Sequence, residues 1–283
     1  MIAEPLPALV RRGLTCGRRL AVAGPDGDWS YAALAARAAR LAGLLLDGRP
    51  DTDEARVALL SPPGAAYVAG QWGTWMAGGV SVPLSPQQTP LEWEYILDDS
   101  RAAAAIVDAE YADAFGPLAT ARHVRIIPAG APGHDLRSGE ADWTRLPCVG
   151  PARRALMLYT SGTTSRPKGV VLTHAGLQAQ VECLSEAWEW RASDRALHVL
   201  PLNHTHGVIN VLACALWNGA VCEFMSGFDV QQTWHRLAPG NKTGPSVFMA
   251  VPTIYSRLIA AWREAPQDVR AAWSKGAAGL RLF

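Results

Sequence analysis

Short apolar segments alternate with longer segments of helical periodicity through most of the chain, and this alternation restricts the possible folds strongly. Residues 55–61 (ARVALLS) are apolar and run into Pro62-Pro63-Gly64, whereas 65–79 (AAYVAGQWGTWMAGG) have helical length and close on two glycines. The same reading predicts further strands at 80–84, 102–107, 123–128, 155–160, 196–202, 220–224, 246–251 and 279–283, and further helices at 29–48, 90–100, 174–190, 207–219, 230–238 and 253–263. Alternating strands and helices favour parallel sheets flanked by helices, so the expected class is α/β.

Residues with helix-capping chemistry mark several of these boundaries. Ser30 is expected to cap the first long helix and Gly48 to end it, while Thr173 is expected to cap the helix at 174–190. The alternation is interrupted at 129–151, a looser stretch rich in Gly and Pro. We therefore expect one large domain over 1–283, with tentative lobes at 1–149 and 150–283.

The composition excludes several classes of function. The chain has 283 residues, with 26 basic and 25 acidic side chains and a formal net charge of +1, so no electrostatic footprint for nucleic acid is present. The most apolar stretch, 208–224, is short and contains Asn and Gly, so no membrane span is predicted. Five cysteines occur without CxxC spacing, which favours buried, reduced thiols over disulfides.

The segment 158–174 (LYTSGTTSRPKGVVLTH) combines small residues, hydroxyl groups and one cation between two apolar runs. Successive backbone N–H groups in such a loop form a concavity that binds anions, and Lys168 adds a full positive charge. The order Lys168-Gly169-Val170 differs from the Walker A loop, which has Gly before the Lys and a hydroxyl after it. The alternative is a polar surface loop without a ligand. The predicted polyphosphate-binding residues are Thr160, Ser161, Gly162, Thr163, Thr164, Ser165, Arg166, Pro167 and Lys168.

The order YTSGTT-x-RPKG resembles the phosphate loop of the adenylate-forming enzymes, a superfamily that includes the acyl-CoA synthetases. Further stretches resemble this superfamily in the expected order: QWGTWMAGGVSVPLSP at 71–86, LPLNHTHGV at 200–208 and VFMAVPTIYSRLI at 247–259. The resemblance implies the large N-terminal domain of that fold, activation of a carboxylate with ATP and Mg²⁺, and transfer of the acyl group to coenzyme A. Ser165 stands where the superfamily has Gly, which puts the loop geometry in question because Ser is less free than Gly at positive φ.

Several of these stretches are most similar to the malonate–CoA ligases. By this resemblance, His206 lies beside the acyl carbonyl and Thr205 near the bound acid, and Lys168 and His206 are the predicted catalytic residues. A dicarboxylate needs a cation for its second carboxylate, and we expect Arg281 to provide it, with a structural Arg as the alternative. His204 and His206 would share a face of an extended segment. No metal site is predicted there, because no third ligand lies nearby.

The resemblance also implies parts that this chain does not contain. The superfamily continues past the stretch resembling 279–283 into an adenine-binding loop, a Mg²⁺-holding Glu and a C-terminal domain with a catalytic Lys. We therefore expect an incomplete N-terminal domain, without the C-terminal domain, that is inactive alone. The sequence-based hypotheses are a malonate (or methylmalonate) CoA ligase, a ligase for another short or medium-chain acid, and a non-catalytic nucleotide-binding fragment. The expected partners are small molecules. The implied location is the mitochondrial matrix, with the cytoplasm as the alternative.

Overall fold

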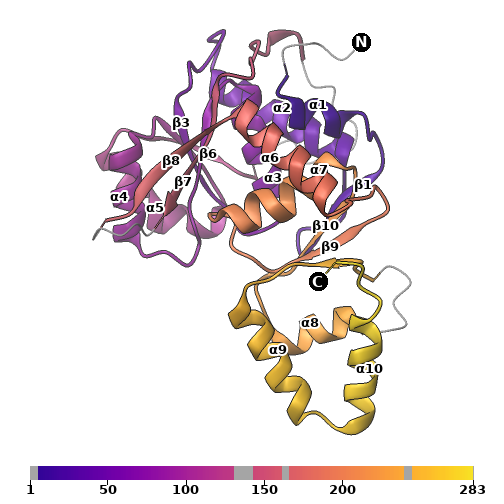
Figure 1. The fold of residues 1–283 in the computed structure, drawn as a ribbon. Coiled ribbons are helices and arrows are strands. Elements are labelled where there is room, and N and C mark those ends of the chain that lie inside the picture. The colour runs from indigo at the N-terminus through magenta and orange to yellow at the C-terminus, as the bar shows by residue number, and fades with distance from the viewer. Residues whose placement is uncertain (1–5, 131–142, 161–165, 239–243, 283) are drawn as a thin grey trace.

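A computed structural model describes residues 6–130, 143–160, 166–238 and 244–282 of the chain (Figure 1). The strands of the described residues form two sheets. One sheet has the order β6-β5-β3-β4-β7-β8 and the other has the order β11-β9-β10-β1-β2. The α/β class with parallel sheets flanked by helices is confirmed.

The first sheet is mainly parallel and ends in an antiparallel hairpin. Its strands are β3 (Arg56–Leu60), β4 (Val80–Pro83), β5 (Ala104–Val107), β6 (Arg125–Pro128), β7 (Arg154–Thr160) and β8 (Lys168–Thr173). β7 runs parallel to β4 but antiparallel to β8. Strand β8 was not predicted, because its residues follow the polar loop and are largely solvent-exposed, so no buried face marks them as a strand.

The second sheet draws its strands from both ends of the chain. Its members are β1 (Leu20–Ala23), β2 (Trp29–Ser30), β9 (Arg195–His198), β10 (Val221–Phe224) and β11 (Val247–Phe248). Leu282 adds one parallel bridge to Val247, at the segment where a final strand was expected. Because β1 pairs with β10 and β7 pairs with β4, both sheets cross the proposed boundary near residue 149. The tentative lobes 1–149 and 150–283 therefore do not correspond to separate sheets.

Helices form three layers around these sheets (Figure 1). The α-helices are α1 (Ala8–Leu14), α2 (Tyr31–Leu46), α3 (Ala65–Met76), α4 (Pro90–Ser100), α5 (Ala112–Ala121), α6 (His174–Ala187), α7 (Cys214–Trp217), α8 (Val230–Leu237), α9 (Pro252–Glu264) and α10 (Gln267–Ala277). The side chains of Ser30 and Thr173 accept hydrogen bonds from Ala33 N and Gly176 N, which confirms both predicted caps. Helix α2 ends with Asp47 in the left-handed conformation, one residue before Gly48, which was expected to end it.

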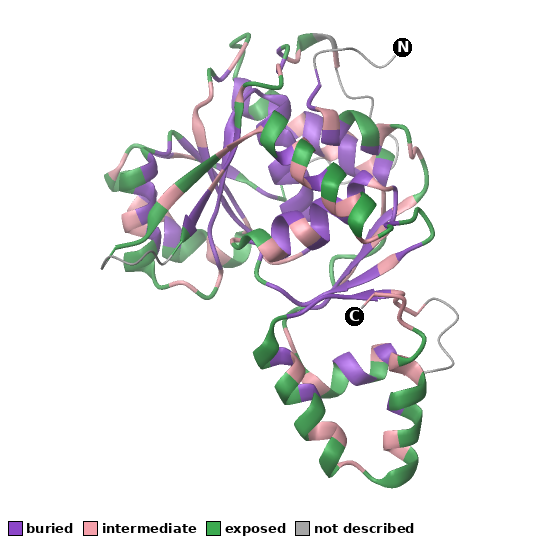
Figure 2. Cartoon of the chain, viewed as in Figure 1, coloured by how far each residue is buried: buried purple, intermediate pink, exposed green. Residues whose placement is uncertain are grey.

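Alternate residues of the central strand β3 serve two different cores. Val57 and Leu59 belong to a large core with α2 and α3 that extends to the second sheet, whereas Ala58 and Leu60 pack on the opposite face with α4 and α5. This division follows from the twofold side-chain period of a strand. Figure 2 shows the resulting pattern, with most strands and the inner helices buried, and with β8 and the outer faces of α8, α9 and α10 exposed. The cores leave the carboxyl ends of the strands free to build a site.

Candidate active site

The carboxyl ends of several strands meet at a cavity of about 550 Å³, a size typical of small-molecule sites. Its walls come from the residues after β3, β4, β9 and β10 and from the beginning of α9. The lining includes Ser61, Gln87, His198, His204, His206, Phe228, Thr253 and Arg257. Ligands of open α/β sheets bind at this edge of the strands, so the cavity is the leading candidate for a substrate site.

A second hollow of about 450 Å³ adjoins this cavity and connects it to the predicted phosphate loop. The two hollows share Ser85, Gln87, Pro201 and His204. The second hollow is also lined by Thr160 and Pro167, which flank the loop. The fold thus brings the loop and the turn after β9 to one continuous depression, although some 40 residues separate them in sequence.

The phosphate loop connects β7 and β8. The hairpin register places Thr160 opposite Lys168, so both ends of the loop lie side by side, and both residues are exposed. Arg166 and Pro167 are exposed as well. Residues 161–165, which include the predicted Ser161, Gly162, Thr163, Thr164 and Ser165, lie outside the described residues. The structure therefore places Thr160 and Pro167 at the hollow, with Lys168 beside Thr160.

Two tyrosines fix the base of this loop. Tyr95 of α4 donates its hydroxyl hydrogen to the carbonyl oxygen of Pro167 at 2.7 Å. Its ring meets the ring of Tyr159 edge to face, with centroids 6.3 Å apart. Tyr159 donates to Asp99 Oδ2 at 2.7 Å, and burial together with that carboxylate raises the pKa of Tyr159. The base of the loop is thus tied to α4 by the hydrogen bonds of these two tyrosines.

Gly169, which follows Lys168, lies where the side chains of β7 leave little room. A Cβ at this position would overlap Met157 and come within 3.2 Å of the Tyr159 ring. Gly169 therefore lets β8 lie close against β7, beside the tyrosines that hold the loop.

His204 and His206, in the turn after β9, both line the cavity of about 550 Å³. Their segment differs from the extended conformation considered in the sequence analysis. The segment is not extended: a π-helical stretch, His206–Ala213, begins directly at the second histidine and continues into α7. Wide helical turns of this kind are frequent at functional sites. Burial lowers the pKa of the His206 imidazole. Thr205 is exposed and is not among the described lining residues of either hollow.

The fully buried His198 contacts the backbone of this turn. His198 Nε2 lies 3.0 Å from the carbonyl oxygen of Gly207. Burial lowers the pKa of His198 to about 4, so the ring is neutral at pH 7 and its Nε2–H donates to that carbonyl. A Cβ on Gly207 would overlap the carbonyl oxygen of Pro201, so only Gly allows the turn to fold this tightly. These contacts hold His204 and His206 in place.

Arg281 does not reach the cavity. Its guanidinium donates to both carboxylate oxygens of Asp194, at 2.8 and 2.5 Å, and to the Trp188 carbonyl at 2.9 Å. Burial would raise the pKa of Asp194, but the hydrogen bonds from Arg281 and Ser246 outweigh it and hold the pKa below its usual value. Asp194 precedes β9, whereas the cavity lies beyond the other end of that strand. The expectation that Arg281 enters near the acid pocket is therefore wrong in its geometry, and the alternative of a structural Arg fits.

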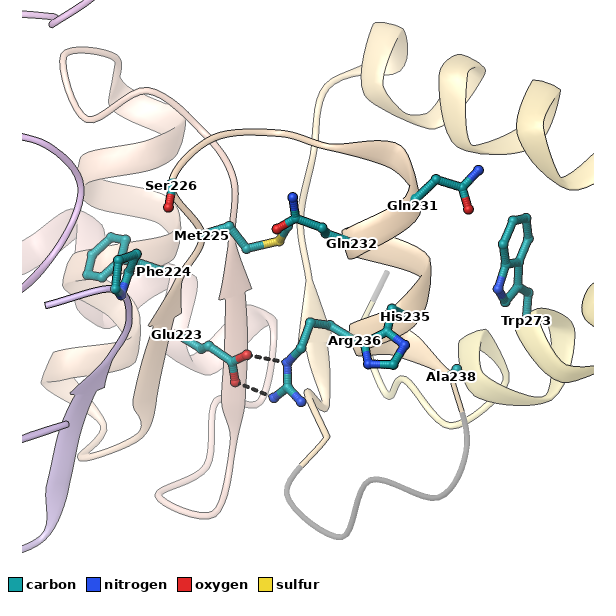
Figure 3. A pocket seen from close by; sticks show the side chains of 11 residues that line it. Glu223, Phe224, Met225, Ser226, Gln231, Gln232, His235, Arg236, Ala238 and Trp273 are labelled. Carbon is teal, nitrogen blue, oxygen red and sulfur yellow. Dashed lines mark hydrogen bonds and ion pairs between the residues drawn. The ribbon is translucent and has the colours of Figure 1, made fainter. Parts of the chain in front are cut away.

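Another hollow lies on the far side of β10, toward α8 and α10 (Figure 3). Its buried acid, Glu223, faces Arg236, and a second pair joins Glu223 to Arg195 at 2.5 Å. Burial tends to raise the pKa of Glu223, but the two arginines dominate and lower it, so the carboxylate is ionised and paired. Trp273 forms another wall. The predicted phosphate-loop residues and histidines do not line this hollow, and its acid is already satisfied.

Metal-binding clusters and membrane-spanning helices are both absent from the described residues. No group of three or more His, Cys, Asp or Glu side chains is arranged to hold a metal ion within the described ranges. None of the described helices is both long and apolar enough to span a bilayer.

Comparison with known proteins identifies the family. The family model described as AMP-binding enzyme matches residues 11–282. The chain belongs to the AMP-binding enzyme family. It is 38% identical over 253 residues to "Malonate–CoA ligase ACSF3, mitochondrial" of Homo sapiens, and the match covers 88% of this chain and 44% of that protein. This AMP-binding chain thus spans less than half the length of that curated relative.

Solved structures support the same assignment. The crystal structure of apo MatB from Rhodopseudomonas palustris matches with a TM-score of 0.80 and 26% identity, covering 98% of this chain and 54% of that one. A malonyl-CoA ligase product complex with methylmalonyl-CoA and AMP bound matches with a TM-score of 0.75 and 28% identity, covering 94% and 52%. The fold of this AMP-binding chain is therefore that of the N-terminal half of such enzymes.

The structure adds residues that sequence reasoning missed. His204 lines both hollows, whereas His206 lines only the cavity of about 550 Å³. The spacing L-P-L-x-H of the quoted motif falls on His204 and was the available signal. No comparable signal marked Tyr95 or Arg257, which reach the site from helices distant in sequence.

Proposed function

We propose that this chain supplies the phosphate- and acid-binding parts of a carboxylic acid–CoA ligase whose preferred acid is malonate or methylmalonate. The observation that carries this proposal is the continuous depression between the ends of the phosphate loop and the histidine turn. Membership of the AMP-binding family and the names of the similar malonate–CoA ligases support the choice of reaction and acid. The chain spans less than half of the human relative, so the whole activity is proposed for a longer protein.

The proposed reaction has two steps. A carboxylate oxygen of the acid attacks the α-phosphorus of ATP, and pyrophosphate leaves. The coenzyme A sulfur then attacks the acyl carbonyl, and AMP leaves while the thiol proton passes to solvent. Thr160, Lys168 and the loop between them bind the phosphates and stabilise the charge that builds on the leaving pyrophosphate. Lys168 is available for this role because it is exposed and lies opposite Thr160 in the hairpin.

The histidine turn is proposed to hold the reacting carboxylate. His204 lies where the two hollows join, between the loop ends and the cavity, and His206 lines the cavity itself. Burial lowers the pKa of His206, which favours its neutral form, and an imidazole N–H can donate a hydrogen bond to a carboxylate oxygen. We therefore assign His204 and His206 to orienting the acyl group, and we leave Thr205 at the edge of the site.

Mg²⁺ and coenzyme A belong to the proposal through the family. Mg²⁺ bound with ATP would neutralise phosphate charge. Because the described residues offer no cluster of metal ligands, no step here uses a metal held by them. The mitochondrial location is likewise proposed from the name of the human relative. Fractionation of the native cells, followed by immunodetection of the protein, tests that location.

A pyrophosphate-release assay tests the function. It should use a protein that carries this chain together with the segments matching the rest of the longer relatives, and it should compare malonate, methylmalonate, acetate and a medium-chain acid. We expect malonate or methylmalonate to give the highest kcat/KM and the 283-residue chain to bind ATP without turnover. Highest activity with acetate or the medium-chain acid would favour the broader ligase. ATP binding by both proteins without turnover would favour the nucleotide-binding fragment.

A further inference from the structure

The turn between β1 and β2, residues 24–28, carries a side chain that caps a helix of the other sheet. Asp26 Oδ2 accepts hydrogen bonds from Ala65 N at 2.8 Å and from Ala66 N at 3.2 Å, at the start of α3. The N-cap residue of α3 is Gly64, which has no side chain to do this, and the first turn of the helix contains no acidic residue. A residue 39 positions away thus supplies the acceptor and the negative charge that a helix N-terminus favours.

The geometry around Asp26 allows this contact and holds it. A Cβ on Gly64 would lie 2.9 Å from both carboxylate oxygens, so glycine at this position lets the carboxylate reach the helix. The turn is closed by a hydrogen bond from Gly27 N to the Gly24 carbonyl oxygen at 3.0 Å. Trp29 Nε1 also donates to the Asp26 carbonyl oxygen at 3.1 Å. Asp26 is exposed, yet its backbone is held on both sides.

The capped end of α3 joins two walls of the cavity of about 550 Å³. Residues 61–63, directly before the cap, line this cavity after β3. In the first turn of α3, the Tyr67 hydroxyl donates to the Leu202 carbonyl oxygen at 3.0 Å. Leu202 lines the same cavity and lies two residues before His204. Tyr67 is buried, so water does not replace its hydroxyl as the donor.

The turn that carries Asp26 belongs to the sheet beneath the histidines. β1 pairs with β10, and Gly24 lies against Phe224 at the end of β10, where a Cβ on the glycine would come within 3.3 Å of the Phe224 Cβ. The Phe224 ring lies 4.9 Å from the ring of His198, which contacts the Gly207 carbonyl oxygen. The Asp26 carboxylate therefore connects this sheet to α3.

We propose that Asp26 is a positioning residue for the acid site. By capping α3 from the other sheet, it holds Tyr67 and, through Leu202, the histidine turn in the arrangement that orients the acyl group. This inference rests on the proposed function. Asp26 is not among the described residues that line either hollow, so it acts through α3 rather than on the substrate. Without the cap the first turn of α3 opens more often, and fewer molecules hold the histidine turn in place.

Steady-state kinetics of the longer protein used in the pyrophosphate-release assay test this role. We expect Asp26→Ala to lower kcat/KM for malonate by about fivefold, which corresponds to the loss of one helix cap. The KM for ATP should stay unchanged, because the phosphate loop lies on the hairpin β7–β8 and not on α3. Asp26→Asn, whose side-chain oxygen can still accept from both amides, should restore most of the lost kcat/KM.

Ser30 provides a matched control from the same hairpin. Its side chain caps α2 by accepting from Ala33 N at 3.2 Å, and α2 contributes no residue to the described lining of the cavity. Ser30→Ala should therefore lower the midpoint of urea denaturation by an amount similar to that of Asp26→Ala, but should keep kcat/KM for malonate. An unchanged kcat/KM in Asp26→Ala, or an equal loss in Ser30→Ala, would overturn the proposal.

Amide hydrogen exchange in the 283-residue chain, followed by NMR, separates this inference from the proposed function. Val208 N donates to the His204 carbonyl oxygen at 3.0 Å, so its exchange reports opening of the histidine turn. Asp26→Ala should speed exchange at Val208, whereas Ser30→Ala should not. Unchanged exchange at Val208 in Asp26→Ala would overturn the proposal whatever the activity. If the longer protein turns over none of the acids, the proposed function fails, and faster exchange at Val208 would still support the link from Asp26 to the turn.

Discussion

The two sides of the site are built in opposite ways. The hairpin side places its ligand-binding loop at the exposed edge of a sheet and anchors it through the Tyr95 hydroxyl. The histidine side is a turn packed against backbone, with His198 fully buried beneath it. The comparison teaches that the hairpin side presents exposed residues held by side-chain hydrogen bonds, whereas the histidine side is held by a buried ring and by close backbone packing.

The strongest test of this difference is a methyl group on the rigid side. In Gly207→Ala the new Cβ meets the Pro201 carbonyl oxygen, which cannot move without opening the turn. We expect a loss of about 3 kcal/mol in the free energy of unfolding, measured by urea denaturation. The control is Gly116→Ala in α5, where a Cβ meets nothing within 4 Å; there stability should rise by roughly 0.5–1 kcal/mol. Equal effects of the two substitutions would contradict the rigid turn.

Acid should weaken the rigid side through His198. Its pKa is about 4 in the folded chain because of burial, against 6.5 ordinarily. The unfolded chain therefore takes up a proton as the pH falls below 6.5, while the folded chain takes it up only near pH 4. Stability is full above pH 6.5 and is lost between these values, by at most about 3 kcal/mol from this group.

Denaturation curves at several pH values check this dependence. His198→Gln should flatten the decline between pH 6.5 and 4. His174, which follows β8 on the hairpin side, also has its pKa lowered to about 4 by burial and by Arg153, so His174→Gln should flatten it independently. An unaltered slope in His198→Gln would show that this ring is not protonated on unfolding.

On the exposed side, the phosphate cation should affect binding rather than stability. Lys168 is exposed at the end of the loop, so Lys168→Ala should weaken ATP binding by about tenfold, typical of a charge-assisted contact. Calorimetry with ATP measures this loss, and urea denaturation should give an unchanged midpoint. Lys275 is equally exposed but belongs to α10 and not to the β7–β8 hairpin, so Lys275→Ala serves as the control. Undiminished ATP affinity in Lys168→Ala would remove the phosphate role.

The hairpin should tolerate the methyl group that the turn rejects. In Gly169→Ala the overlapping atom is the flexible end of Met157, which can rotate away. We expect a loss of about 1 kcal/mol, clearly smaller than for Gly207→Ala. Paired urea denaturation of the two variants measures the difference. A loss at Gly169 as large as at Gly207 would mean that the hairpin is as rigid as the turn.

The smallest expected effect concerns the anchor of the loop. Tyr95→Phe removes the hydrogen bond to the Pro167 carbonyl and should cost about 1 kcal/mol or less, because water can replace the donor at this exposed position. ATP affinity should fall by a few-fold, since the loop loses one restraint. ATP titration of Tyr95→Phe against the unaltered chain measures this change, and an affinity loss as large as that of Lys168→Ala would show that the anchor is essential.

Local patterns in the sequence predicted the class and most elements, but not the long-range pairing. The alternation located the buried strands because their apolar residues are contiguous, and Ser30 and Thr173 marked true helix starts. Strand β8 has no buried face and gave no signal. Which half of the chain contributes to which sheet depends on pairings such as β1 with β10, which no local pattern encodes.

The site was predictable where one continuous segment carries it and not where distant segments meet. The phosphate loop was read from its own residues, and the structure places Thr160 and Pro167 at the hollow, with Lys168 paired to Thr160 across the hairpin. The sequence indicated Arg281 as the cation for the acid, and only the fold shows that Asp194 already pairs with it. Which charged side chains pair with one another depends on the tertiary fold.

A crystal structure of this chain with a non-reactive sulfamate analogue of malonyl adenylate tests the central claim most directly. We predict that the analogue spans both hollows, with its sulfamate, which replaces the phosphate, near Thr160 and its acyl group beside His204. Binding of the analogue between Glu223 and Trp273 would contradict this account.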